Sequence, residues 1–519
     1  MRVYKVKSPI DNNILYEMYD PDMMEIRRLY ERAKSSFEII RNLSIDERLR
    51  ECRKIQNYVA ENREWIIDRI VIENGKSRFD CLSNEIFVVL DAIEYYKKNA
   101  ARILADKNVS TPLTLRGKKS KIIYEPIGVV LVLSPWNYPL YQSIVPILSA
   151  FIAGNSVIYK PSEITPLHGM IEEIIIKSGF MEEAIQVVYG GPDTGEKLIE
   201  AKPEKIFFIG GVKTGKKIMA LAARQLIPVV LELGGKDSMI VFDDADLEKT
   251  AIGALWGALT NAGQACISVE RIYAQENIYD HFVKTLAEKI VLLKQAHDKD
   301  NNIEMEYIDI GSMTAERQVD IVDQHVKDAI NKGARVLIGG KKGSHPFHYP
   351  ATLIADVNHT MKVMTEETFG PVLAVMKFAT EEEAVRLAND SPYGLGASVW
   401  SKDKMRADRV ARKIAAGNVC INNVMLTVAN PALPFGGVKY SGFGRYKGEY
   451  GLYAFTNVKS IVIDKMNSKI EGHWFPYTPN KYKAFSDLID ALYSKSKSFL
   501  KFIWAGLKLE SIAKKERLK

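Results

Sequence analysis

The sequence predicts an α/β protein with two large domains, because of its length, its alternating apolar runs and its composition. The 519 residues exceed what one ordinary hydrophobic core accommodates, so we expect two large domains and smaller pieces. From Lys121 onwards, short apolar runs alternate with helix patterns, which is typical of parallel, doubly wound sheets. Hydrophobic residues make up 47% and charged residues 26% of the chain, as in soluble globular proteins.

Residues 21–105 are predicted to be helical, because apolar side chains recur there at three-to-four spacing among charged ones. Ser44 and Glu47 form a capping-box pattern that predicts a helix start, and Gly75 predicts a helix end. The N-terminal residues lack an apolar core, so we expect no signal peptide.

The first alternation of strands and helices predicts a parallel sheet. It opens with "KIIYEPIGVVLVLSP" (121–135), whose apolar, β-branched residues predict a strand buried on both faces. Ligands of such sheets bind beyond the carboxyl ends of the strands, where Gly- and Pro-rich turns fall here. Further strands are predicted in "SVIYKPS" (156–162), "AIQVVYGG" (184–191), "KIFFIGG" (205–211) and "PVVLELGG" (228–235).

A second alternation predicts another α/β domain after the first. Its helices are expected near 245–262, 278–296, 314–332 and 381–389. Its strands are expected in "RIYAQE", "ARVLIGG" and "LAVMKFAT", before the chain returns through loops in "NVCINNVMLTVANPALPFGGVKYSGFGR".

The net charge of +7 is concentrated in the C-terminal tail. Residues 480–519 hold ten Lys or Arg and four Asp or Glu, so the rest of the chain is close to neutral, which argues against nucleic-acid binding. The tail has the pattern of a basic amphipathic helix that lies on an anionic membrane. A helix docked on the protein's own body or on a partner subunit fits the pattern equally well. The apolar residues of this pattern are Phe485, Leu488, Ile489, Leu492, Phe499, Leu500, Ile503 and Leu507.

The cysteines predict a thiol enzyme in a reducing compartment. The four cysteines lie far apart, without a CxxC pair or a Cys/His cluster, so neither a disulfide framework nor a metal site is expected. Cys266 stands behind Gly263 and Gln264, which break a helix pattern and suggest a loop at a cleft, although a free cysteine is usually a small buried hydrophobe. Glu232 ends an apolar strand, where a carboxylate is rare. A thiolate attacks carbonyl carbons, and a carboxylate can activate the water that releases a thioester.

Six segments resemble the signature segments of the aldehyde dehydrogenase superfamily, in the same order and over roughly Glu125 to Val462. The resemblance implies NAD(P)-dependent oxidation of an aldehyde to a carboxylic acid. It also implies a Rossmann-like, doubly wound parallel cofactor domain, a second α/β catalytic domain and a small β oligomerisation element. The segments are "SPWNYP", "YKPSE", "LELGGKDS", "NAGQACISVER", "EETFGPV" and "PFGGVKYSGFGR".

The resemblance implies three catalytic residues. Cys266 is the nucleophile, Glu232 activates the deacylating water, and Asn137 donates its amide to the oxyanion beside the backbone N–H of Cys266. Relatives that form acyl-CoA or acyl phosphate lack this glutamate, so Glu232 favours hydrolysis to the free acid.

The resemblance also implies a nicotinamide cofactor site and no metal. Glu163 accepts ribose hydroxyls and repels a 2′-phosphate, which favours NAD while NADP stays open. Gly211 replaces a serine common in relatives, so one phosphate hydrogen bond is expected to be missing. The cofactor-binding residues implied are Trp136, Lys160, Glu163, Gly191, Gly210, Gly211, Gly215, Glu367 and Phe369.

Two alternatives of another class remain open at this point. Gly210 to Lys216 spells the G-x-x-x-x-G-K of a P-loop NTPase after a strand, but Lys217 replaces the Ser/Thr that a P-loop needs for magnesium. The second alternative is a relative of these enzymes that has no catalytic activity and acts as a binding protein. A cysteine–histidine protease fits less well, since no His stands in a comparable turn.

The segment before "PFGG" predicts the type of aldehyde. Residues 422–433 are apolar and lack Arg and Lys, whereas relatives that take succinic semialdehyde usually need a cation for its second carboxylate. We therefore expect an aliphatic, fatty or aromatic aldehyde, with a small polar aldehyde such as succinic semialdehyde as the alternative. Packing of a loop explains the apolar residues nearly as well.

The expected domain organisation follows the same resemblance. We expect a cofactor domain in 1–103 and 126–233, a catalytic domain in 234–443, a bridging element in 104–125 and 444–463, and a tail in 464–519. The bridging element implies a homodimer or homotetramer. The location expected is cytoplasmic, with the tail on the inner membrane face where it binds lipid.

Overall fold

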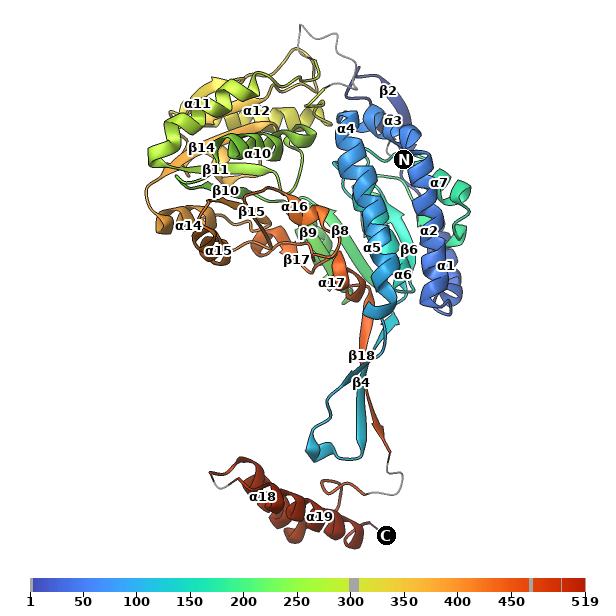
Figure 1. Ribbon diagram of the computed structural model, residues 1–519. Coiled ribbons are helices and arrows are strands. Elements are labelled where there is room, and N and C mark those ends of the chain that lie inside the picture. The colour runs from blue at the N-terminus through green and yellow to red at the C-terminus, as the bar shows by residue number, and fades with distance from the viewer. Residues whose placement is uncertain (1–2, 298–307, 466–469, 496, 519) are drawn as a thin grey trace. The chain divides into compact units, whose positions relative to one another are not determined.

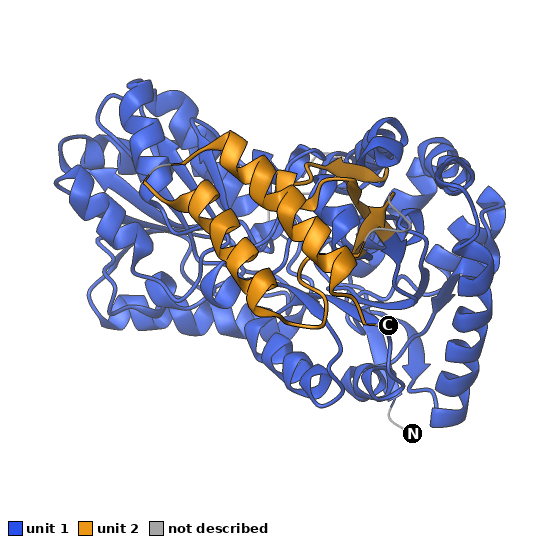
Figure 2. Ribbon diagram, turned by 90° about the horizontal axis from the view of Figure 1, so that it is seen from below, with its two compact units in different colours: residues 1–104, 125–457 blue, residues 105–124, 458–519 orange. Residues whose placement is uncertain are grey.

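The computed structural model describes residues 3–297, 308–465, 470–495 and 497–518. It divides into two compact units, coloured separately in Figure 2: residues 1–104 with 125–457, and residues 105–124 with 458–519. The separation of a cofactor domain from a catalytic domain within the first unit stays a prediction.

The first unit contains the parallel sheet that the sequence predicts, with helices against it (Figure 1). Neighbouring strands among β5 to β9 run parallel, and β17 adds an antiparallel edge beside β9. Every residue of β5 is buried, as expected for a strand covered on both faces. The order across the sheet is β17 (Gly442–Phe443), β9 (Val229–Leu233), β8 (Lys205–Gly210), β5 (Val129–Leu133), β6 (Ser156–Lys160) and β7 (Ile185–Val187).

The helices of this half begin and end largely where the sequence signals stand. The capping box of Ser44 and Glu47 is formed, and Gly75 ends a helix in the left-handed conformation with φ 81°. The elements are α1 (Met23–Ile40), α2 (Ile45–Glu61), α3 (Arg63–Asn74), α4 (Arg78–Cys81), the π-turn η1 (Leu82–Phe87), α5 (Val88–Ile103), α6 (Tyr141–Ile152), α7 (Met170–Ser178), α8 (Pro192–Glu200) and α9 (Val212–Ala223). An N-terminal hairpin, β1 (Val3–Lys7) and β2 (Ile14–Tyr19), was not expected from the sequence.

A second sheet in the same unit confirms the second α/β alternation. Its strands are parallel except for the antiparallel edge strand β12. The order is β12 (Arg335–Ile338), β13 (Thr352–Ala355), β14 (Val372–Phe378), β11 (Val269–Gln275), β10 (Asp237–Val241), β15 (Gly396–Trp400) and β16 (Asn418–Ile421). Its helices are α10 (Leu247–Leu259), α11 (Tyr279–Ile290), α12 (Glu316–Asn331), α13 (Lys362–Thr365), α14 (Glu381–Asn389), α15 (Lys404–Lys413), α16 (Leu426–Ala429) and α17 (Gly448–Tyr453).

The run 121–135 is not a single strand, so this expectation was wrong. It divides at Gly128, where a φ of 133° breaks the extended conformation. This position has no room for a side chain, because a Cβ there would lie 2.8 Å from Glu204. The first part belongs to β4 (Lys118–Pro126) and the second is β5. In a small three-stranded sheet, β4 lies between β3 (Lys107–Val109) and β18 (Thr456–Asp464).

The second unit ends in two helices where the sequence predicted one amphipathic helix. They are α18 (Pro479–Tyr493) and α19 (Phe499–Lys515), which pack against each other as a hairpin. Small side chains such as Ala484, Ala491, Ala505 and Ala513 are buried and let the two helices approach closely. Ser498 caps α19 by accepting the N–H of Lys501, so the chain starts a new helix there. None of the helices in the described part of the chain is long and apolar enough to cross a membrane.

Candidate active site

A cavity of about 700 Å³ opens at the carboxyl ends of the six-stranded sheet. The strand order reverses between β5 and β8, because the chain runs outwards from β5 to β7 on one side and continues with β8 and β9 on the other. Doubly wound sheets bind ligands at this reversal, where the turns after neighbouring strands diverge. Residues 134–137 after β5 and 210–211 at the end of β8 line the cavity.

The cavity brings together eleven of the twelve residues that the sequence singled out. The exception is Gly215 on α9, where a Cβ would lie 2.6 Å from the side chain of Leu233. Its lack of a side chain therefore lets α9 pack closely against β9. The eleven residues that line the cavity are Trp136, Asn137, Lys160, Glu163, Gly191, Gly210, Gly211, Glu232, Cys266, Glu367 and Phe369.

Cys266 reaches the cavity on a sharply bent turn after α10. Asn261, Ala262 and Gly263 have positive φ values of 51°, 54° and 73°, which turn the chain back on itself. A Cβ at Gly263 would lie 2.2 Å from the carbonyl oxygen of Gly370, so this position admits glycine alone. The other three cysteines are buried, whereas Cys266 is partly exposed. The structure thus presents this thiol to the cavity.

Glu232 is a buried carboxyl whose neighbour in the cavity is the thiol of Cys266. Its side chain is 1% exposed, and neither carboxyl oxygen has a hydrogen-bond partner among the described residues. Burial raises the pKa of Glu232 to about 8, interaction with the thiol of Cys266 lowers it, and the charges of Glu367 and Asp237 raise it further. Burial, and next the charge of Glu232, raise the pKa of the Cys266 thiol well above its usual value. The thiol and the carboxyl therefore face each other, and the protonated forms of both are favoured.

Asn137 is held beside the turn that carries Cys266. Its Nδ2 donates to the carbonyl oxygen of Gln264 at 2.9 Å, which leaves a second amide hydrogen to donate. The carbonyl oxygen of Asn137 accepts from Lys76 Nζ at 2.7 Å and from Asn261 Nδ2 at 3.0 Å. The amide is therefore fixed close to the thiol, as an oxyanion donor must be.

A buried ion pair supports this arrangement and was missed by the sequence analysis. Lys76 Nζ lies 2.7 Å from Glu85 Oε1, and both side chains are fully buried. Glu85 also accepts the backbone N–H groups of Leu140 and Tyr141, so the pair holds the chain on both sides of Pro139. Lys76 precedes α4 and Glu85 lies within η1, and their pairing depends on a fold that the sequence pattern does not reveal.

The N-termini of two helices offer backbone N–H groups that can bind the pyrophosphate of a dinucleotide. α8 begins after Gly191 and α9 after Gly211, and neither start has a side-chain cap. The free backbone N–H groups and the dipoles of such helices suit a pyrophosphate. A Cβ at Gly211 would meet no atom within 4 Å, so the space for a capping serine exists but is not used.

The expected ribose-binding residues lie on the walls of this cavity. Lys160 ends β6, and its ammonium lies 3.9 Å from the carboxyl of Glu163. Burial lowers the pKa of Lys160, and its Nζ donates to the carbonyl of Pro161 at 2.9 Å. Without the resemblance to a family this pair would pass for a surface ion pair.

The loop between α13 and β14 supplies the other predicted ribose contacts. Glu367 accepts the N–H of Gly235 at 3.0 Å, and burial raises the pKa of Glu367 to about 8. The buried carboxyl of Glu270 accepts the N–H of Phe369 at 2.9 Å and so fixes the loop. The Phe369 ring meets Trp136 edge to face, with centroids 5.3 Å apart.

A model described as the "Aldehyde dehydrogenase family" matches residues 1–461. The chain belongs to the aldehyde dehydrogenase family. A 4,4′-diapolycopene aldehyde oxidase of Methylomonas sp. is 40% identical over 94% of this chain and 91% of its own length. A mitochondrial succinate-semialdehyde dehydrogenase of Arabidopsis thaliana is 32% identical over 90% and 87%. The structure of a betaine aldehyde dehydrogenase of Staphylococcus aureus in complex with NAD⁺ is similar, with a TM-score of 0.84 and 30% identity over 92% of this chain and 96% of that one.

These findings show an aldehyde dehydrogenase that uses a nicotinamide cofactor, NAD or NADP. They overturn the P-loop NTPase interpretation of Gly210 to Lys216. The structure gives the physical reason, because α9 already begins at Val212 and Lys216 lies within the helix. Its ammonium stands 4.2 Å above the ring of Tyr440 and does not line the cavity of the dehydrogenase.

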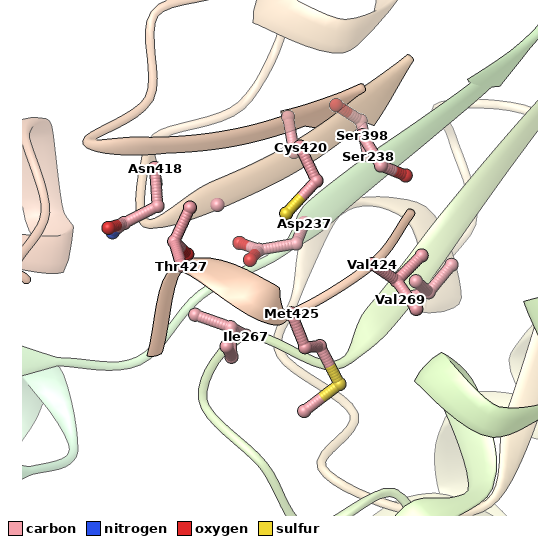
Figure 3. Close-up of a pocket in the computed structure, with 12 residues that line it drawn as sticks. Asp237, Ser238, Ile267, Val269, Ser398, Asn418, Cys420, Val424, Met425 and Thr427 are labelled. Carbon is pink, nitrogen blue, oxygen red and sulfur yellow. The ribbon is translucent and has the colours of Figure 1, made fainter. Parts of the chain in front are cut away.

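The apolar segment 422–433 lines a second, small cavity. This cavity of about 20 Å³ lies between the segment and the residue that follows Cys266 (Figure 3). Val424 and Met425 contribute apolar side chains from the segment, and Ile267 contributes one from the turn. In this aldehyde dehydrogenase the segment thus lies beside the residue that follows the cavity thiol.

Lys447 is a residue near this segment that the sequence analysis missed. It is 1% exposed, and its Nζ donates to the carbonyl oxygen of Val428. Burial lowers the pKa of Lys447 to about 7, while Asp91 raises it. A cation therefore does reach the segment from elsewhere in the fold, but a backbone carbonyl engages it. Its position in the turn "RYKGEYG" carries no signal of burial.

Proposed function

We propose that this aldehyde dehydrogenase oxidises an apolar aldehyde to the free acid through a covalent bond to Cys266. The observation that carries the proposal is the cavity shared by a partly exposed thiol and an unpartnered carboxyl, with a fixed amide beside them. Neither group has another evident task in the fold, since a buried carboxyl without hydrogen bonds is costly.

The first half of the reaction forms a thioester. Glu232 takes the thiol proton, and Cys266 Sγ attacks the aldehyde carbon to give a thiohemiacetal. The Nδ2 amide of Asn137 and the backbone N–H of Cys266 donate to the oxygen, which carries the negative charge. Bound NAD(P) supplies the acceptor for the hydride that leaves the same carbon. Lys160, Glu163, Glu367 and Phe369 would hold the cofactor.

The second half releases the acid. Glu232 first releases the thiol proton to solvent. It then takes a proton from a water molecule whose oxygen attacks the thioester carbon, and as the carbon–sulfur bond breaks it passes this proton to the leaving sulfur. The products are a carboxylic acid and the free thiol, so the enzyme returns to its starting state. The burial of Glu232 raises its affinity for this proton, as its raised pKa indicates.

Three observations favour an apolar aldehyde. The segment 422–433 has no Lys or Arg, and its Leu426 and Leu433 are exposed at 48% and 41%. The cation that does reach it, Lys447, is buried against Val428. The relative at 40% identity is named for an apolar aldehyde, while those named for succinic semialdehyde are 32–35% identical.

A series of saturated aldehydes of rising length, assayed with NAD and with NADP, tests the substrate. We expect kcat/KM to rise about fourfold with each added methylene until the site is filled, the value of one buried methylene. Succinic semialdehyde is expected to react at least tenfold more slowly than the uncharged aldehyde of equal length. A preference for succinic semialdehyde would contradict the apolar assignment while leaving the cysteine route intact.

We further propose that the α18–α19 hairpin binds anionic lipid and thereby brings the enzyme to membrane-dissolved aldehydes. The support is an exposed apolar surface in a segment with six surplus positive charges, the combination that adheres to anionic bilayers. The exposed apolar residues of the hairpin are Tyr482, Phe485, Ile489, Tyr493, Phe499, Leu500, Ile503, Trp504 and Leu507.

Sedimentation with vesicles of phosphatidylserine and phosphatidylcholine tests the hairpin. The wild type is expected to pellet with these vesicles and not with pure phosphatidylcholine, and Leu500→Glu with Trp504→Glu should abolish pelleting. Both side chains are more than 60% exposed, so folding is preserved. Leu292→Glu with Met405→Glu, equally exposed positions in the first unit, is the matched control and should pellet normally. Unchanged pelleting of the hairpin variant would refute lipid binding.

A further inference from the structure

The N-terminal hairpin contacts the wall of the cofactor cavity through one buried carboxyl. Asp20 directly follows β2, and its side chain is 8% exposed. Its Oδ1 accepts the backbone N–H of Gly191 at 2.8 Å and the hydroxyl of Thr194 at 2.7 Å. Gly191 lines the cavity and directly precedes α8. The carboxyl of Asp20 is therefore hydrogen-bonded to the cavity wall itself.

Tyr4 of the same hairpin fixes this carboxyl from the other side. Its hydroxyl donates to Asp20 Oδ2 at 3.1 Å. A Cβ at Gly191 would lie 2.1 Å from the Tyr4 ring, so the ring occupies the place of a side chain at that position. Both oxygens of Asp20 are thus bonded, and the carboxyl cannot turn away from the cavity wall.

Asp20 is ionised at neutral pH. Burial raises its pKa, but its three hydrogen bonds and the charge of Lys197 lower it, and the pKa lies below its usual value. Lys197 lies close by, since its Nζ donates at 2.9 Å to the carbonyl oxygen of Pro21, the residue after Asp20. A negative charge is therefore held at the N-terminus of α8.

This charge lies on the part of the wall where the adenosine ribose is expected. Lys160 ends β6 and Gly191 follows β7, which is the parallel neighbour of β6. Lys160, Glu163 and Gly191 all line the cavity. Burial lowers the pKa of Lys160, while the charges of Glu163 and Asp20 raise it, as expected for neighbours.

The N-terminus of α8 is a poor place for a further anion. A helix N-terminus binds an anion through its backbone N–H groups and its dipole. The N–H of Gly191 already donates to Asp20, and Pro192 at the first position of the helix has none. A phosphate there would find fewer donors than at a free helix N-terminus and would meet a like charge.

We propose that Asp20 is a specificity-determining residue whose charge disfavours the 2′-phosphate of NADP and so favours NAD. The proposal rests on the proposed cofactor site, in which Lys160 and Glu163 hold the adenosine ribose. NAD has an uncharged hydroxyl in place of this phosphate, so the carboxylate does not repel it. Asp20 acts in addition to Glu163, which is expected to accept the ribose hydroxyls directly.

Asp20→Asn tests the proposal, because the amide keeps the shape of the side chain and an oxygen for the N–H of Gly191 but has no charge. Isothermal titration calorimetry without aldehyde gives the Kd of NAD and of NADP. We expect the Kd of NADP to fall about tenfold and that of NAD to change less than threefold, the effect of one charge removed near a phosphate. An unchanged ratio of the two Kd values would overturn the proposal. Equal weakening of both would also overturn it, since that is a structural loss.

Lys197→Gln is a second variant with an expected effect of opposite sign. It removes the cation beside Asp20 and keeps a donor for the carbonyl of Pro21. We expect the Kd of NADP to rise about threefold relative to that of NAD, because the carboxylate then acts without this counter-charge. Shifts of the same sign in both variants would contradict an effect of charge.

Asp22→Asn is the matched control. It removes a carboxylate two residues away, which caps α1 and does not line the cavity, and Asn caps helices as well as Asp. Both Kd values should stay those of the wild type, and a shift in their ratio would refute the assignment to Asp20. The measurement needs no turnover, so it is independent of the cysteine route. A wild type that binds neither dinucleotide would refute the cofactor site itself.

Discussion

Replacement of Cys266 by alanine is expected to lower the formation of reduced cofactor by at least about a thousandfold, since the variant has no atom to hold the substrate covalently. The absorbance of the reduced cofactor in the presence of NAD and a medium-chain aldehyde measures the effect. A catalytically silent binding protein would show no such absorbance in the wild type.

Cys52→Ala is the control for the loss of a thiol. Cys52 is fully buried on α2 and does not line the cavity, so its variant should keep wild-type turnover even if it loses some stability. Activity of Cys266→Ala above a few per cent would contradict the covalent route.

Glu232→Gln is expected to retain a first burst of reduced cofactor and then to turn over about 10²- to 10⁴-fold more slowly, because the water that releases the acyl group loses its base. The burst requires that water or added base takes the thiol proton, so the reaction is best followed at pH 9. Stopped-flow absorbance separates the burst from the slow phase. If the burst and the slow phase decreased by the same factor, Glu232 would act only in activation of the thiol.

The pH dependence of turnover tests the same role of Glu232. The pKa of Glu232 is raised to about 8, so the protonated form predominates below pH 8 and the base form above it. Wild-type turnover should therefore increase as the pH rises through 8, and Glu232→Gln should lack this increase. Glu367→Gln is the matched control: it neutralises a second buried carboxyl of the cavity, and should raise the KM for the cofactor while the increase with pH persists.

Local signals in the sequence predicted much of the fold. The capping box at Ser44, the stop at Gly75 and the apolar run of β5 act through neighbouring residues, and each appears where it was expected. The division of the run 121–135 was missed because it depends on Glu204, which occupies the place of a side chain at Gly128. The tail was taken for one helix because its apolar periodicity continues across the break near Ser498.

The candidate site was predictable where the family motifs stand and not elsewhere. Cys266, Glu232 and Asn137 come from three separate segments. The chemistry of a thiol and a carboxylate suggested the first two together, and resemblance to a family added Asn137. Lys76 and Glu85 could not be paired in the same way, because the type of a residue does not show whether its charge is buried. The same holds for Lys447.

The close approach of Gly263 to the Gly370 carbonyl has a mechanical consequence. No methyl group fits between the turn that presents the sulfur and the loop that presents Glu367 and Phe369, so neither can slide past the other. A side chain added at position 263 would therefore displace the thiol-bearing turn and the loop with Glu367 and Phe369 together. One substitution at this contact would thus disturb both hydride transfer and acyl release.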